Sequence, residues 1–191
     1  MEFGELNYVL AGLAVAKRNA DGTFDTPIYI ENGQMYSSEP EHETDKLSGY
    51  GQYTEGLSVP KGTKLSLKMG GIEYDVLAAM GVVTISASSG ATPHRTKTID
   101  WGAGGEGVGY FGVIGTSAAK GGGIVAIGHQ KVMLEEGISV TADGESNKFN
   151  ISEASAYSFP VNNQLFRGKT YETAADFTMP TNGIDFANFF S

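Results

Sequence analysis

The chain has 191 residues, which is enough for one domain with a complete hydrophobic core and short for two domains. It contains 27 glycines and 6 prolines, and this richness in glycine indicates the many turns and bulges of an all-β protein. Cysteine is absent, which excludes disulfide bonds, thiolate metal sites and a cysteine nucleophile. The 22 acidic and 13 basic residues give a net charge of −9, which excludes tight binding to a nucleic-acid backbone.

Charge is distributed unevenly along the chain. Residues 1–60 carry 10 acidic and 3 basic side chains, residues 61–131 carry 4 and 7, and residues 132–191 carry 8 and 3. An ordinary solvated surface tolerates such blocks. They are also compatible with contact between the basic middle of one copy and the acidic flank of another, which would steer association.

Two features of the sequence bear on where the protein is made. Residues 1–5 are acidic and lack the basic region that begins a signal peptide. No apolar run approaches the length of a membrane helix, about 20 residues. We therefore expect a soluble protein made in a cytoplasm.

Alternation of apolar and polar residues predicts strands along most of the chain. The first is apolar and covers residues 6–15, and the Asp21-Gly22 pair that follows predicts a turn. Asn32-Gly33, a strong hairpin signal, separates strands predicted over residues 26–31 and 34–38. The remaining strands are predicted over residues 63–69, 124–134, 138–141, 149–158 and 164–170.

One segment, residues 71–81, has the periodicity of a short amphipathic helix. Acidic residues in its first turn favour the positive end of the helix dipole. Val76 and Leu77 are neighbours, and Met80 follows one turn later. We expect a helix over about residues 72–80 that packs these three side chains on a sheet.

Two stretches lack a clear period and are predicted as long loops, an acidic one over residues 37–56 and a glycine-rich one over residues 102–123. In the acidic stretch, four carboxylates alternate and would share one side of an extended chain: Glu39, Glu41, Glu43 and Asp45. Three interpretations remain open for this row. It is a solvated face, a site for a hard cation such as calcium, or a wall facing a neighbouring subunit or a channel.

Motifs that would carry catalysis are weak. Residues 102–107 match G-x-G-x-x-G, but a glycine-rich strand follows instead of the helix that a dinucleotide site needs. His42, His94 and His129 lack the spacing of a local metal-ligand pair. No serine-nucleophile motif is present. The sequence therefore predicts no catalytic residue, no cofactor and no metal.

Three phenylalanines lie within the last six residues, which is unusual for a chain end: Phe186, Phe189 and Phe190. They form either a last core strand or an exposed apolar patch. The turn-like residues 181–183 and the preceding Pro180 favour release of the chain from the domain. We expect residues 181–191, with Ile184, to be an arm that docks on a neighbouring subunit.

In its layout the chain resembles the major tail proteins of long-tailed bacteriophages of the siphovirus type, which build the tail tube. The resemblance covers residues 6–160 and rests on the order and spacing of its segments. These are the first strand with its Asp21-Gly22 turn, the acidic stretch 38–45, the alternating strand 63–69, the helix 72–80 directly after it, the strand 123–132 and the segment 137–141.

This resemblance implies a single tail-tube domain over residues 1–191, with a β-sandwich or barrel core and a flanking helix. It implies six-fold rings whose inner strands join into one barrel around a channel, and an extended loop and terminal arms that stack the rings. Here residues 37–56 would be the loop and residues 184–190 the arm. DNA would pass through the channel without binding, and an acidic chain suits that task because like charges repel phosphate.

The partners implied by the resemblance are further copies of the chain and tail proteins such as the tape measure, terminator and distal tail proteins. The implied location is the virion tail, after assembly in the host cytoplasm, with no membrane contact. The predicted function is structural and not enzymatic. Two alternatives remain: another tube component of the same fold, such as a contractile-tail tube or distal tail protein, or a carbohydrate- or calcium-binding β-sandwich module.

Overall fold

The computed structural model describes residues 9–30, 33–49, 52–69, 74–86, 98–101, 109–119, 121–135 and 152–191. Within these residues, eight strands form one antiparallel sheet. Seven follow one another in the order β2 (Ile28–Tyr29), β1 (Val9–Lys17), β7 (Phe111–Ala118), β8 (Ile124–Leu134), β9 (Ser152–Ser158), β4 (Gln52–Met69) and β3 (Gly33–Gly49), and β10 (Arg167–Tyr171) pairs with β8. The mainly β class is confirmed.

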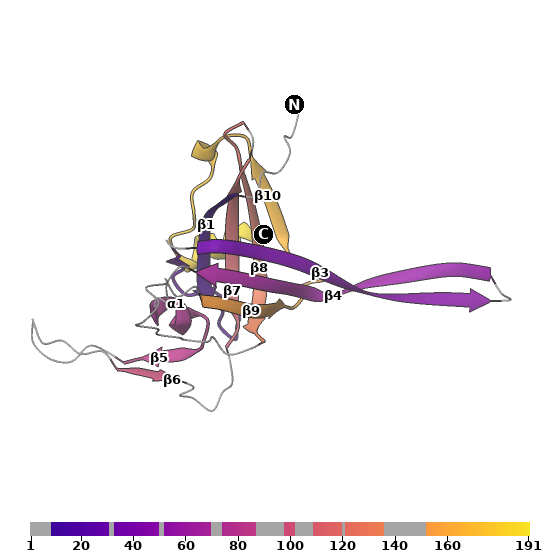
Figure 1. The fold of residues 1–191 in the computed structure, drawn as a ribbon, viewed down its shortest axis with the longest axis horizontal. Helices are drawn as coiled ribbons and strands as arrows, with labels where there is room; N and C mark the ends of the chain where they lie inside the picture. The colour runs from indigo at the N-terminus through magenta and orange to yellow at the C-terminus, as the bar shows by residue number, and fades with distance from the viewer. Residues whose placement is uncertain are drawn as a thin grey trace, which may run out of the picture.

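The sheet divides at β8. One edge of β8 pairs with β7, whereas the other edge pairs with β10 from Ile124 to Gly128 and with β9 from Val132 to Leu134. The register between β7 and β8 shifts between these two parts, as at a β-bulge, which bends a strand. As a result β9, β4 and β3 cross over the strands β7 and β8 at a steep angle, and the two parts face each other like the layers of an orthogonal sandwich (Figure 1).

The main core lies between these two parts and is closed by α1 (Tyr74–Ala79). Alternation in β1 sends Leu13 and Val15 into this core, because successive strand residues point to opposite faces. Helix α1 contributes Val76 and Leu77, and Met80 follows directly after it; all three side chains are almost fully buried. A separate ribbon of β5 (Val83–Ile85) and β6 (Ile99–Trp101) follows the helix.

A second core covers the opposite face of β1, β7 and β8. It is built by α2 (Gly183–Phe189), which follows the short helix η1 (Ala174–Asp176). The Asn182 side chain caps α2 by accepting a hydrogen bond from the Asp185 amide at 2.8 Å. The expectation of a C-terminal docking arm is therefore wrong for its phenylalanines, since Phe186, Phe189 and Phe190 are buried within their own chain.

The same packing corrects the expected glycine-rich loop. Residues 102–108 lie outside the described residues, but residues 111–118 form the buried strand β7. A β-carbon on Gly112 would lie 2.6 Å from the ring of Phe24, and one on Gly128 would lie 2.6 Å from that of Phe189. These glycines leave room for the aromatic rings of the second core. Both glycines lie in regular strands, β7 and β8, and not in a loop.

The acidic loop expected over residues 37–56 is also not irregular. It belongs to the paired strands β3 and β4, whose register runs from Gly33 opposite Met69 to Gly49 opposite Gln52. Strand β9 begins at Ser152 within the expected range 149–158, while residues 6–8, 138–141 and 149–151 of the predicted strands lie outside the described residues.

Candidate assembly surfaces

The most prominent surface feature is a long two-stranded projection. Strand β4 pairs with β9 only from Thr63 to Met69, so beyond this point β3 and β4 pair only with each other among the described strands. We call this projection the hairpin arm, residues 41–49 and 52–62. Figure 1 shows it extending far from the body of the protein. Eight or nine residues at about 3.3 Å each give it a reach of roughly 30 Å.

The acidic row predicted from the sequence lies on β3 at the base of the hairpin arm. Glu39 and Glu43 are exposed, and the side chain of Asp45 lies outside the described part of the chain. Glu41 is half-buried: its carboxylate lies 2.8 Å from Lys64 Nζ and accepts a hydrogen bond from the Tyr157 hydroxyl at 3.2 Å. The hydrogen bond from Lys64 lowers the pKa of Glu41. Among the described side chains of the row, two are therefore exposed and one is paired.

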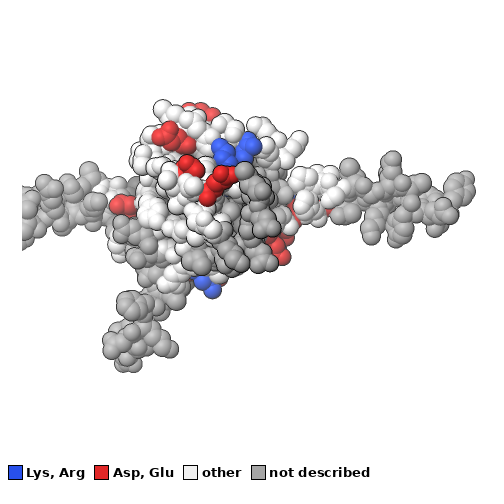
Figure 2. All heavy atoms as spheres, turned by 90° about the horizontal axis from the view of Figure 1, so that it is seen from above, with Lys and Arg blue, Asp and Glu red and all other residues white. Residues whose placement is uncertain are grey.

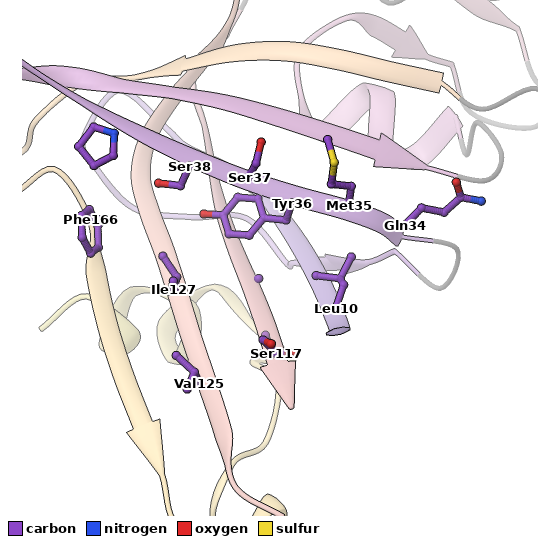
Figure 3. Close-up of a pocket in the computed structure, with 13 residues that line it drawn as sticks. Leu10, Gln34, Met35, Tyr36, Ser37, Ser38, Ser117, Val125, Ile127 and Phe166 are labelled. Atoms are coloured by element: carbon purple, nitrogen blue, oxygen red, sulfur yellow. The ribbon is translucent and has the colours of Figure 1, made fainter. Parts of the chain in front are cut away.

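A mostly apolar groove of about 530 Å³ lies between the first half of β3 and the strands β7 and β8. Figure 3 shows Val125 and Ile127 on its floor, Leu10 at one end and Phe166 at the other. Consecutive residues 34–38 line one wall, which means that the outer edge of β3 itself borders the groove. Strand β3 ends the sheet order, so among the described strands it has a neighbour on one side only. The groove could therefore accept an extended segment that pairs with β3.

A buried histidine lies where β3 crosses β8. His129 has no exposed surface, and its Nε2 atom lies 3.1 Å from the Ser38 hydroxyl, which also lines the groove. Its ring makes an edge contact with Tyr36 at 6.1 Å and lies 5.8 Å from the Phe166 ring. Burial lowers the pKa of His129 to about 4 and raises the pKa of Tyr36. A β-carbon on Gly115 would collide with the Tyr36 ring, so this glycine leaves room for the tyrosine against β7.

This histidine predicts a pH dependence of stability. Because its pKa is about 4 in the folded protein and ordinarily 6.5, the unfolded chain binds more protons between these two values. The contribution of the neutral ring is complete above pH 6.5 and is lost as the pH falls toward 4, at a cost of up to about 3 kcal/mol. Denaturation at several pH values should show this decline, and His129→Gln should remove it. An NMR titration in which the His129 ring protonates near 6.5 would contradict the prediction.

Nothing in the local sequence around Ser38 or His129 indicates their contact, because 91 positions separate them. The other predicted histidines do not join this site: His42 is exposed on the hairpin arm, and His94 lies outside the described residues, as does the glycine motif 102–107. In the described part of the chain, no three side chains of the metal-binding types lie together. Ile184, assigned to the expected arm, is 75% exposed on α2.

The charged side chains on the face drawn in Figure 2 are scattered. In its described part, Figure 2 shows several separate acidic groups and a basic group beside an acidic one, without a broad field of either sign. None of the helices among the described residues is long and apolar enough to span a membrane. In the described residues these surfaces define a class of protein: a small mainly β protein with an open strand edge, an apolar groove beside it and a projecting hairpin.

Comparison with known proteins finds only limited structural similarity. No protein-family model matches the chain, and no curated protein matches it. Among solved structures, the chain is similar to one from the six-fold symmetrised cryo-EM structure of the anti-feeding prophage (AFP) baseplate. The two share 10% sequence identity with a TM-score of 0.38, over 88% of this chain and 97% of the other.

Proposed function

We propose that this protein is a non-enzymatic structural subunit that self-assembles into six-fold rings, which stack into the tail tube of a long-tailed bacteriophage. The observation that carries the proposal is the hairpin arm. A two-stranded ribbon is at best marginally stable in water without a third strand or a packing partner. Beyond the base, the described strands of the arm pair only with each other, and Val59 in it is 49% exposed. A neighbouring subunit would supply the missing support.

The groove and the open edge of β3 support the same proposal. An exposed edge strand is a template for pairing with another chain, and here it is 17 residues long. Phe166 beside it is 44% exposed, which suits an apolar contact. Head-to-tail contacts of this kind close into rings when the rotation between copies permits. The sequence resemblance supplies the particular assembly: rings around a channel, stacked by the segment that is here the hairpin arm.

In this proposal each surface has a role. The hairpin arm contacts the adjacent ring, and the acidic residues on it face a neighbouring subunit or the channel. DNA is a cargo that passes without binding. The tape measure, terminator and distal tail proteins are contacts at the interior and ends of the tube, and the location is the virion tail. The three phenylalanines of α2 take no part in these contacts, because they fill the second core of their own chain.

Shortening the hairpin arm tests the proposal. Residues 42–61 can be replaced by Asn-Gly, since Glu41 and Gly62 are opposite each other and a two-residue turn can join them. We expect a subunit that still unfolds cooperatively on heating, because both cores are intact, but that forms no tubes in electron micrographs. A matched variant, Glu43→Gln with Asp45→Asn, keeps the arm and removes two of its charges. Tubes of normal length from the shortened chain would exclude the arm from assembly.

A further inference from the structure

The face of β3, β4 and β9 that points away from the main core carries a regular arrangement of charges. In β4, Leu65 and Leu67 point into the core, so Lys64, Ser66 and Lys68 point outward. The residues opposite them on the neighbouring strands share this face: Glu39, Ser37 and Met35 on β3, and Tyr157, Ser155 and Glu153 on β9. We call this surface the ladder face.

Both lysines of the ladder face are held by carboxylates of adjacent strands. Lys64 Nζ lies 2.8 Å from Glu41, and Lys68 Nζ lies 3.1 Å from Glu153. Each carboxylate is also held by a hydroxyl: Tyr157 donates to Glu41 at 3.2 Å, and Ser66 donates to Glu153 at 3.0 Å. The hydrogen bond from Lys68 lowers the pKa of Glu153, and the bond to Glu41 raises the pKa of Lys64.

These pairs contribute little to stability, because ion pairs in contact with solvent have small net free energies. Their effect on binding is larger. A phosphate backbone binds where free lysine or arginine side chains replace its counterions. The charge of each of these lysines is balanced by a carboxylate that a hydroxyl also holds in place, so a phosphate would have to displace the carboxylate to bind the lysine. The ladder face therefore carries lysines without presenting a cationic surface.

We propose that the ladder face is the wall of the channel and that its two ion pairs prevent a nucleic acid from adhering as it passes. The inference rests on the proposed function. It adds which surface lines the channel and why lysines on that surface do not hold the passing nucleic acid. Small hydroxyl side chains at Ser37, Ser66 and Ser155 lie between the two ion pairs on this face. The opposite side of the same three strands is the main core.

The position of the face can be tested by cysteine labelling, because the chain has no cysteine of its own. Ser155→Cys places one thiol at an exposed position of the ladder face. In assembled tubes we expect reaction with a small maleimide and none with a maleimide carried on a large polyethylene glycol. Free subunits, the control, should react with both reagents. Tubes that react with both, or with neither, would overturn the assignment, while a wild-type chain that forms no tubes would overturn the proposed function itself.

The charge pairing can be tested on the same tubes. Glu41→Gln with Glu153→Gln releases both lysines, and Asp75→Asn with Glu172→Gln makes the same change in net charge at exposed positions outside the ladder face. Wild-type tubes and the control variant should not retain short duplex DNA in co-sedimentation. The first variant should retain it at about 50 mM salt and lose it by about 200 mM. No retention by the first variant, or equal retention by the control, would overturn the proposal.

Discussion

Truncation of the chain after Asn182 is expected to lower the free energy of unfolding by about 5 kcal/mol or more. The deletion removes Phe186, Phe189 and Phe190, all buried against β1, β7 and β8. A single buried phenylalanine replaced by alanine costs about 3–5 kcal/mol, and here three are lost together. Because stability is typically about 5–15 kcal/mol in total, the truncated chain should be largely unfolded or molten.

Contacts between the aromatic rings of the second core explain why this loss of stability should be so large. Phe24 lies 4.9 Å from Phe186 and 5.8 Å from Phe190 between ring centroids, so a residue near the first hairpin depends on the C-terminus. Arg167 also donates a hydrogen bond to the Phe190 carbonyl at 2.9 Å, which ties the end of the chain to β10. Urea denaturation of the truncated and full-length chains measures the difference. Ile184→Ala, which alters the exposed side of α2, should change stability by less than about 0.5 kcal/mol. A truncated subunit that melts like the full chain would contradict this account of the second core.

Replacing Leu77 by alanine is expected to destabilise the protein by roughly 2–5 kcal/mol. Its side chain has no exposed surface and lies in the main core between the crossing parts of the sheet. The loss combines the transfer free energy of the removed carbons with the cavity that they leave. Tyr74→Ala in the same helix is the matched control, since Tyr74 is 51% exposed. Equal stability of the Leu77→Ala variant and the wild type would show that the helix does not close the core.

The sequence pattern predicts those elements whose two faces differ. Residues 63–69 alternate because one side of β4 faces the core and the other faces solvent, and residues 72–80 are amphipathic because α1 covers one side of the sheet. Strand β7 is buried on both faces and contains glycines under aromatic rings, so no alternation marks it. The acidic residues that alternate in β3 of the hairpin are polar, so its pairing with β4 leaves little trace in hydrophobicity.

The C-terminal helix has clear signals in the sequence. Phe186, Phe189 and Phe190 have the i, i+3, i+4 spacing of a helical face, and Asn182 followed by Asp185 is a typical helix start. In the sequence the turn-like residues before it favour release of the chain, whereas in the structure Asn182 caps the helix. The groove and the Ser38–His129 contact could not be predicted in the same way, because both depend on the crossing of β3 over β8.

Electron microscopy of the purified full-length protein tests the central claim most directly. The proposed function predicts rings and stacked tubes with a central channel, and six-fold symmetry in averaged end-on views. It also predicts that tubes become longer as the protein concentration rises, since each ring supplies the surface for the next. Particles that remain single 20.2 kDa subunits at all concentrations, by microscopy and by size-exclusion chromatography, would contradict the claim that the hairpin arm and the β3 edge exist for self-assembly.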